Sequence, residues 1–255
     1  RHAFFATSSN SGGGSSDAKL EEAARIRLET WTKEVAASLV DGKAAMSDSD
    51  ACGGAPAELT AKIQAAVDAL EKGLVERGEE ARVLLLAAVC AEHVLMLGPP
   101  GTAKSALARR LVRLGGEDAV FFERLVTRFS VPEELFGPLS LRALERDEYI
   151  RQTKGYLPEA TVAFVDEIFK ANSAILNSML SLVNERVFDN GAGRELVPLR
   201  CLVAASNEPP ESEELDALYD RFLFRLCVRP VTDDGVAALV AAATSRGGGV
   251  EEGPL

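Results

Sequence analysis

The residues with the clearest chemical meaning are eight consecutive ones, 98–105, which follow the apolar segment 93–97. A glycine-bearing turn between a strand and a helix points several backbone N–H groups into one small space. The partial positive charge at the start of the helix adds to this effect, so the turn suits the phosphate chain of ATP. The predicted phosphate-binding loop consists of Gly98, Pro99, Pro100, Gly101, Thr102, Ala103, Lys104 and Ser105.

Two side chains of this loop would complete the binding of a nucleotide. Lys104 can reach the β- and γ-phosphates, and the hydroxyl of Ser105 can hold Mg²⁺. The position before the lysine is Ala103, where this loop usually has glycine. Because Ala103 stands where the helix begins, we expect a negative φ there, which alanine tolerates. Taken alone, the run could also be a Gly/Pro turn without a chemical role.

The segment 162–167, VAFVDE, indicates an apolar strand that ends in two acids. Ligands of open α/β sheets bind at the carboxyl ends of the strands, so acids at this place would face the loop. Asp166 would orient Mg²⁺ and its waters, and Glu167 would polarise the attacking water. An isolated pair of this kind is more often the end of a strand in a solvated turn. Its position downstream of a phosphate loop favours the catalytic interpretation.

Two further residues extend the pattern. Asn207, at the end of another apolar segment, could position the same water or contact the γ-phosphate. Arg221 could be offered to the γ-phosphate of a neighbouring subunit, a contact that raises turnover by ~10³–10⁵-fold in related chemistry. Each has a simpler alternative, a turn asparagine or a solvated arginine. The ordered set of lysine, acids, asparagine and arginine is much more specific than any one member.

These residues need a parallel α/β frame to bring them together. The alternation of apolar strands with helical segments predicts a five-stranded, mostly parallel sheet with helices on both faces. Helices are expected near 58–71 and 74–91, separated around Gly73, and again directly after the loop. The expected strands are 93–97, 121–126, 161–166, 201–206 and 222–228.

Smaller elements are expected between these strands. A helix with Leu176, Met179, Leu180 and Val183 on one face would have Ser173 as its N-cap. Two small β-hairpin insertions are predicted, one near 139–157 and one near 187–198 that turns at Asn190-Gly191. The cysteines at 90, 201 and 227 stand in apolar runs and are interpreted as small buried hydrophobes. His93, at the start of a strand, is interpreted as structural.

Composition limits the function classes. The chain has 255 residues, of which 47% are hydrophobic and 26% are charged, and no apolar run approaches the ~18 residues of a membrane span. The net charge of −11 argues against a general nucleic-acid binder, because phosphate contacts need clustered Lys and Arg. ATP binding remains compatible with this charge, because local N–H groups and one metal ion bind the phosphates.

Several longer motifs strengthen the pattern, and together they resemble the AAA+ ATPases. The details are similar to the MoxR group of that family, and most closely to its regulatory ATPase variant RavA. The resemblance covers roughly residues 60–230 and implies a P-loop NTPase core in a three-layer sandwich. It is carried by GPPGTAKS (98–105), TRFSVPEELFGPLSL (127–141), GYLPEA (155–160), FVDEIFKAN (164–172), AILNSMLSLVNER (174–186), LVAASNE (202–208) and LYDRFLFRL (218–226).

The resemblance implies properties that spacing alone does not show. It implies a ring, expected to be hexameric, with ATP at the subunit interfaces and Arg221 as the arginine that acts in trans, with Arg225 as second choice. The 139–157 insertion would face the pore or substrate, and the 187–198 hairpin would precede the strand that ends at Asn207. It also implies chaperone-like remodelling or maturation of a client protein, often beside a partner with a von Willebrand A (vWA) domain.

On this basis the chain divides into three parts. Residues 1–56 are expected to hold a flexible tail, an accessory helix over 17–40 and a linker, 57–230 the AAA+ core, and 231–255 the start of a C-terminal extension. The helical lid that such ATPases carry, with a further arginine, does not fit before Leu255. Three functions stay open at this point: an ATP-hydrolysing remodeller, a nucleotide-gated scaffold with little hydrolysis, and a nucleic-acid motor.

The expected location is intracellular and soluble. Residues 1–16 are rich in Ser and Gly and contain no acidic residue. They could be the remnant of a transit peptide, which would place the protein in an organelle matrix. A tail without functional importance, in a cytoplasmic protein, is the alternative.

Overall fold

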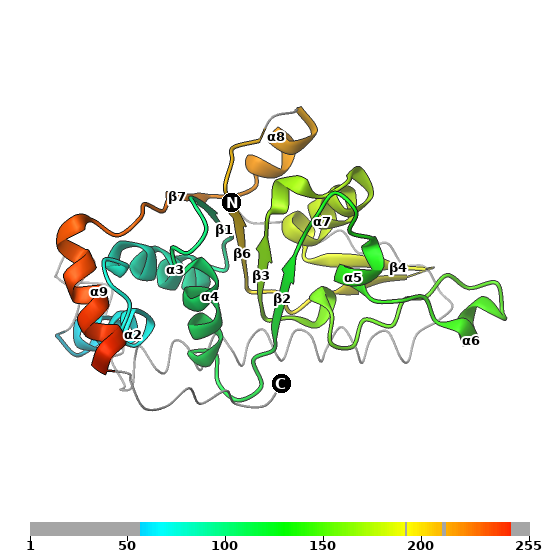
Figure 1. The fold of residues 1–255 in the computed structure, drawn as a ribbon. Coiled ribbons are helices and arrows are strands. Elements are labelled where there is room, and N and C mark those ends of the chain that lie inside the picture. The colour runs from blue at the N-terminus through cyan, green and yellow to red at the C-terminus, as the bar shows by residue number, and fades with distance from the viewer. Residues whose placement is uncertain (1–56, 192, 211–212, 246–255) are drawn as a thin grey trace.

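The computed structural model describes residues 57–191, 193–210 and 213–245 (Figure 1). The predicted tail, accessory helix and linker in 1–56 and the last ten residues lie outside the described part. Within that part, no helix is long and apolar enough to cross a membrane.

Five parallel strands form the central sheet in the order β2-β3-β6-β1-β7. The sheet confirms the predicted α/β fold, and each expected strand is present within two residues of its predicted ends. The largest difference is at the edge strand β7, which was predicted two residues too long at its start and one at its end. Only one neighbouring strand fixes its hydrogen bonds, so its ends are less well defined. The strands are β1 (Val94–Leu97), β2 (Phe121–Leu125), β3 (Val162–Asp166), β6 (Cys201–Ser206) and β7 (Phe224–Cys227).

Helices cover both faces of the sheet, as Figure 1 shows. Residues alternate along each strand between two apolar clusters, because successive side chains of a strand point to opposite faces. One cluster joins Met96 and Phe164 to α2 (Ala57–Glu71), α3 (Gly78–Cys90) and α4 (Lys104–Arg113). The other joins Leu95 and Val165 to α5 (Pro132–Phe136), α7 (Ser173–Glu185) and α8 (Glu213–Tyr219). The last helix, α9 (Asp233–Ser245), follows β7.

Two predicted helix starts are wrong. The second helix begins at Gly78 and not at residue 74, because Glu76 adopts a left-handed φ of 57° that interrupts the helix. The N-cap of α7 is Asn172 and not Ser173. Its side-chain oxygen accepts a hydrogen bond from the Ile175 N–H at 3.1 Å, and its amide group donates to the Ser130 carbonyl at 2.8 Å. Asparagine is as good an N-cap residue as serine. Here its amide group makes a second hydrogen bond, and this favours Asn172 as the cap.

The two insertions are joined to each other. The 187–198 hairpin forms as predicted, from β4 (Val187–Asn190) and β5 (Gly193–Leu196). The other insertion is not a hairpin of strands: a single bridge pairs Leu139 with Arg151, and α6 (Leu141–Leu144) lies between them. The buried Asn190 side chain accepts from the Arg151 N–H at 2.6 Å and donates to the Arg151 carbonyl at 3.2 Å. Both insertions therefore project together from one side of the sheet (Figure 1).

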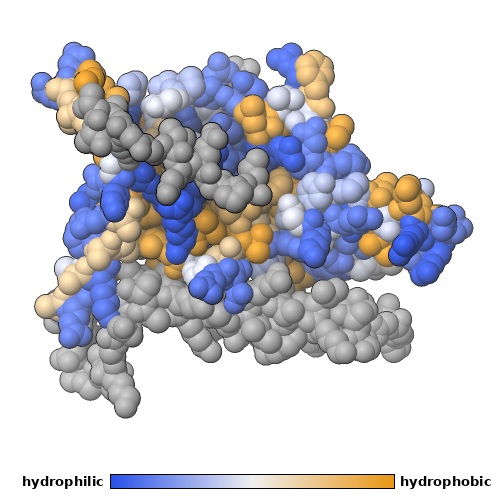
Figure 2. Space-filling view, turned by 60° about the horizontal axis from the view of Figure 1, so that its bottom comes forward, coloured by the Kyte–Doolittle hydropathy of each residue, from blue (hydrophilic) through white to orange (hydrophobic). Residues whose placement is uncertain are grey.

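The projecting end that carries α6 mixes hydrophobic and hydrophilic surface, as Figure 2 shows on the right. Leu141 is 76% exposed and Tyr149 is 69% exposed, among charged neighbours. Large apolar side chains this open to water are available for contact with another molecule.

The histidine and cysteine predictions have mixed outcomes. His93 is buried, and its Nδ1 accepts from the Leu202 N–H at 3.0 Å. Burial lowers the pKa of His93 to about 3, so the ring is neutral. Its role is structural, because it accepts the hydrogen bond from β6. Cys201 is buried as predicted, but Cys90 and Cys227 are exposed, because one ends a helix and the other lies on an edge strand. Cys52 lies outside the described residues.

Candidate nucleotide-binding site

The predicted phosphate-binding loop is fixed at the carboxyl edge of the sheet. The Gly98 N–H donates to the Ser206 carbonyl of β6 at 3.0 Å, and the Val228 N–H donates to the Leu97 carbonyl at 2.7 Å. A Cβ atom on Gly98 would lie 2.2 Å from the Val228 carbonyl oxygen. Glycine is therefore required where the loop leaves β1, because the backbone of Val228, directly after the neighbouring strand β7, passes too close for a side chain.

The loop conformation corrects the prediction for Ala103. Its φ is +66°, in the left-handed region, and α4 begins one residue later at Lys104. The expected negative φ was wrong, because Ala103 is the residue before the helix and not its first residue. Alanine adopts here the conformation that glycine usually supplies, at a cost of about 1–2 kcal/mol. The turn is held by the Thr102 hydroxyl, which donates to the Pro99 carbonyl at 3.0 Å.

Lys104 points back into the loop. Its Nζ donates to the carbonyl oxygens of Gly98 at 2.8 Å and Pro99 at 2.9 Å. Burial lowers the pKa of Lys104, and the nearby charges of Asp166 and Glu167 oppose this shift. The lysine and the two acids thus share one edge of the sheet, which is the arrangement that the sequence predicts.

The acids end β3, two strands away from β1. The Oδ1 of Asp166 accepts from the Glu167 N–H at 3.0 Å, and Glu167 has a left-handed φ of 55° at the start of the 3₁₀ turn Ile168–Lys170. Asn207, which follows β6, donates its Nδ2 to one Glu167 oxygen. Lys170 forms an ion pair with the other oxygen at 3.2 Å. The structure therefore brings Asn207 to Glu167 as predicted and adds Lys170, which sequence reasoning missed.

A cavity of about 380 Å³ opens beside Glu167 and Ser206. The exposed Arg128, from the loop after β2, also lines it and was not singled out from the sequence. Its only signal there is its place in the TRFS motif, next to the end of a strand. Arg128 therefore faces the same cavity as Glu167 and adds a positive charge to the one that Lys170 brings there.

Arg221 lies away from this cluster. Phe224 pairs with Val94 at the start of β1, whereas the loop follows the end of β1, so Arg221 precedes β7 at the opposite edge of the sheet. Arg225 is engaged within the chain, since its Nε donates to the Phe222 carbonyl at 3.1 Å and its guanidinium lies 4.1 Å from the centre of the Tyr219 ring. Arg221 is exposed, and its side chain makes no hydrogen bond or ion pair to the described residues.

The order of the strands, with a phosphate-type loop after β1 and acids after β3, defines the class of AAA+ nucleotide-binding domains. The chain belongs to the MoxR family within it. A family model described as the MoxR domain in the MoxR-vWA-beta-propeller ternary systems matches residues 61–251. The match supports the MoxR group that the motifs predicted and does not support the narrower likeness to the RavA variant. By family the chain is thus an AAA+ ATPase, a class that binds ATP.

Individual proteins also match the chain. The chain is 48% identical over 175 residues to Uncharacterized protein MJ0079 of Methanocaldococcus jannaschii, a match that covers 68% of this chain and 46% of that protein. It is 50% identical over 163 residues to Uncharacterized protein MJ0812 of the same organism, covering 64% and 43%. The chain thus spans about half the length of these relatives.

Among solved structures, a candidate ATPase from Cytophaga hutchinsonii superimposes with a TM-score of 0.58 at 16% identity, covering 89% of this chain and 60% of that one. At this identity the likeness concerns the fold alone.

Proposed function

We propose that this chain binds ATP on the 98–105 loop and hydrolyses it with Glu167 as the residue that polarises water. The observation that carries the proposal is the meeting of three strand ends. The loop follows β1, Asn207 follows β6, and Asp166 ends β3, which are neighbouring strands of one parallel sheet. This is the place where open α/β sheets bind their ligands.

The loop has room for phosphate. A Cβ atom on Gly101 would meet nothing within 4 Å, so the top of the loop is open. The Lys104 ammonium can exchange its two hydrogen bonds to carbonyl oxygens for hydrogen bonds to phosphate oxygens, which carry more negative charge. The ten-residue helix α4 adds its first unpaired N–H groups and its positive end.

The residues present also fit Mg²⁺. The Ser105 hydroxyl and the Asp166 carboxylate are oxygen donors, which this ion prefers. Among the described residues there is no cluster of three or more His, Cys, Asp or Glu that could hold a metal by itself. Phosphate oxygens and water would therefore complete the shell, as is usual for this ion. When bound, it would neutralise charge that develops on the phosphates.

Glu167 and Asn207 act on the water. The carboxylate accepts a hydrogen bond from the attacking water and orients it toward the γ-phosphorus, while the Asn207 amide holds the carboxylate in place. Positioning and charge stabilisation supply most of the rate in this chemistry, so small displacements of Glu167 have large effects.

Arg221 serves a neighbouring copy of the chain. Its place at the far edge of the sheet from the loop of its own chain, and its lack of a described partner, suit a contact in trans. Such a contact requires a closed assembly, and a hexameric ring is the form we propose. Hydrolysis in one subunit then alters the interface with the next, which can move a bound client.

The partner and client are proposed from the family. The matching family model describes the MoxR domain of ternary systems that combine MoxR, vWA and beta-propeller components. A vWA partner is therefore proposed for this chain, with remodelling or maturation of a client protein as the outcome. The exposed Leu141 and Tyr149 at the projecting end supply apolar surface for such a contact.

The experiment that tests hydrolysis compares three proteins. Lys104→Ala should abolish tight ATP binding in equilibrium titration. Glu167→Gln should bind ATP normally and release phosphate far more slowly, because the amide cannot polarise water. Arg221→Ala should bind ATP and lose turnover only in the assembled state. Undiminished ATP affinity of Lys104→Ala would refute the loop assignment, and normal turnover of Glu167→Gln would refute the role of that residue.

A second candidate function, a nucleotide-gated scaffold that hydrolyses little, is favoured by one observation. Both carboxylate oxygens of Glu167 are already engaged, one by Asn207 and one by Lys170. A carboxylate held on both sides is less free to accept a water. Steady-state phosphate release with and without Mg²⁺ separates the two functions, because the scaffold would bind ATP and release almost no phosphate.

A further inference from the structure

We propose that Glu76 and Arg77 form a relay that couples the phosphate-binding loop to the first turn of α9. The inference rests on the proposed ATP binding and extends it, because it names how an occupied loop would change the segment after the sheet. Arg77 is a positioning residue in this relay and does not contact the reacting atoms.

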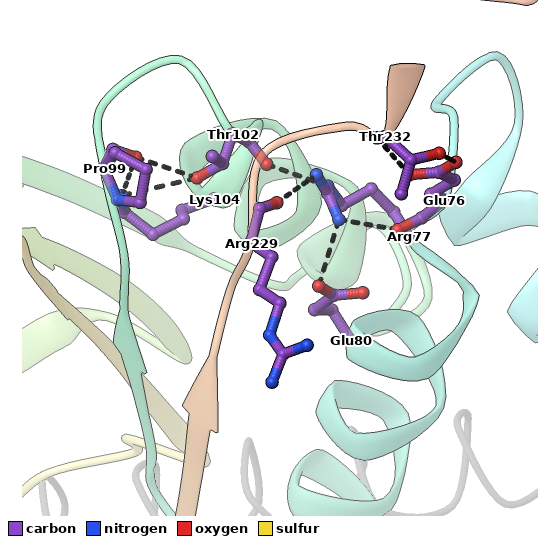
Figure 3. A network of polar contacts seen from close by, with 8 residues as sticks. All are labelled: Glu76, Arg77, Glu80, Pro99, Thr102, Lys104, Arg229 and Thr232. Carbon is purple, nitrogen blue, oxygen red and sulfur yellow. Dashed lines mark hydrogen bonds and ion pairs between the residues drawn. The ribbon is translucent and has the colours of Figure 1, made fainter. Parts of the chain in front are cut away.

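Arg77 joins two segments that are far apart in the sequence (Figure 3). Its side chain is buried, with 4% of the residue exposed. The Nε atom donates to the Thr102 carbonyl of the loop at 3.1 Å, and one terminal nitrogen donates to the Arg229 carbonyl at 2.7 Å. A guanidinium is planar and presents its donors in a fixed fork, so these two carbonyls are held at a set distance from each other.

The third nitrogen of the Arg77 guanidinium is also engaged. The other terminal nitrogen donates to the Glu76 carbonyl at 2.6 Å and forms an ion pair with Glu80 at 3.2 Å. The side chain of Glu80 is itself nearly buried, so this pair is shielded from solvent. The guanidinium therefore has no freedom to rotate, and a shift of one of its partners displaces the others.

Glu76 connects the relay to α9. One carboxylate oxygen accepts from the Thr232 N–H at 2.9 Å and the other accepts from the Thr232 hydroxyl. The same hydroxyl accepts from the Gly235 N–H at 3.2 Å, so Thr232 caps the helix that follows. A Cβ atom on Gly235 would lie 2.5 Å from a Glu76 carboxylate oxygen. The first turn of α9 is therefore built directly against Glu76.

At the loop end of the relay, Arg77 contacts the Thr102 carbonyl, which we expect to shift when phosphate binds. The Thr102 carbonyl belongs to the peptide before Ala103, whose left-handed φ shapes the loop. Phosphate would draw the Lys104 ammonium away from Gly98 and Pro99. Because Lys104 shares the Pro99 carbonyl with the Thr102 hydroxyl, its departure changes the contacts of the turn that Thr102 closes. Arg77 carries the resulting shift of the Thr102 carbonyl to residue 229.

The far end of the relay has room to respond. A cavity of about 530 Å³ lies against it, lined by Arg77, Arg229 and Thr232 among others. Residues 229–232 can therefore shift without displacing core side chains. On α9 itself Val236, Leu239 and Val240 are exposed, so the packing of this helix is light enough to be changed by a few hydrogen bonds.

The test uses hydrogen exchange on the full chain, with and without a non-hydrolysable ATP analogue and Mg²⁺. In the wild type, the analogue should slow exchange in 98–105 and change exchange by about threefold or more in 229–240. Arg77→Met keeps the apolar stem and removes the guanidinium. It should keep the response at 98–105 at saturating analogue and lose the response at 229–240.

A matched control separates coupling from stability. Arg200 is also buried, with 8% exposed, and donates to the carbonyls of Ala88 at 3.1 Å and Val89 at 2.8 Å, at the other edge of the sheet. Arg200→Met should lower the Tm as Arg77→Met does but leave the response at 229–240 intact. If the analogue changes exchange at 229–240 as much in Arg77→Met as in Arg200→Met, the relay is overturned.

A second variant covers the case in which Arg77→Met fails to fold. Glu76 is exposed, so Glu76→Ala removes the hydrogen bonds to Thr232 and keeps the backbone carbonyl that Arg77 contacts. It should retain the response at 98–105 and lose the response at 229–240, and a retained response at α9 would refute the relay. If the wild type shows no response at 98–105 at all, ATP binding itself is refuted. A failure of the relay, in which only the response at 229–240 is contradicted, is thus distinguishable from a failure of ATP binding, in which the response at 98–105 is absent.

Discussion

Ala103→Gly should stabilise the protein, although glycine in place of alanine ordinarily destabilises the interior of a helix. The structure puts Ala103 at a φ of +66°. Relief of the left-handed strain is worth about 1–2 kcal/mol. The greater freedom of glycine in the unfolded chain costs about 0.4–1 kcal/mol. The balance is a gain of about 0.5 kcal/mol, or a Tm higher by about 1–2 °C for a domain of this size.

The sign of this change is diagnostic. If Ala103 had a negative φ, the same substitution would lower the free energy of unfolding by about 0.5–1 kcal/mol. The assay is urea denaturation followed by circular dichroism, and Ala106→Gly in α4 is the control, expected to lose about 1 kcal/mol. A loss at residue 103 similar to that at residue 106 would refute the left-handed conformation. ATP affinity should be retained, because glycine is the residue that this loop usually carries.

Three other predictions concern the frame around the site. Gly98→Ala should lower the free energy of unfolding by about 1–3 kcal/mol in the same assay, because the new methyl meets the Val228 carbonyl. Folding lowers the pKa of His93 to about 3, so the unfolded chain binds the extra proton and stability falls as pH drops from 6.5, by up to about 1.4 kcal/mol per pH unit. Urea titrations at several pH values in this range should show that the free energy of unfolding depends less steeply on pH in His93→Gln than in the wild type. An equally steep pH dependence would contradict a neutral buried ring. Asn190→Ala should speed hydrogen exchange in 138–151, because both of its bonds to Arg151 are lost; unchanged exchange would show that the two insertions are independent.

The sheet and the edge that carries the candidate site could be predicted, because burial on both faces leaves a simple apolar pattern in a parallel strand. Segments such as 162–165 and 201–205 are apolar throughout, since both faces of the sheet are covered by helices. Polar residues directly after such segments must then gather at one edge. This reasoning is enough to bring Asp166, Glu167 and Asn207 together without any knowledge of the turns between them.

The remaining features depend on contacts between distant segments. The peptide before the left-handed Ala103 is held from outside the loop, by Arg77. In the sequence Arg77 stands among the charges of residues 76–80, which resemble a solvated helix start. Lys170 likewise looks like a surface lysine until the turn after β3 brings it to Glu167. Single-sequence patterns record burial well, but they do not record which distant carbonyl a charged side chain reaches.

The seam between the two insertions limits how this region can be re-engineered. Asn190 supplies the hydrogen bonds that a second strand would otherwise give to Arg151, and Gly191 passes so close that a Cβ there would lie 2.8 Å from the Tyr149 carbonyl oxygen. A transplant of the α6 tip into another scaffold would leave the Arg151 backbone unsatisfied unless residues 187–196 came with it. Changes in the length of one insertion would likewise need a compensating change in the other. The two segments are therefore best exchanged between proteins as a single cassette.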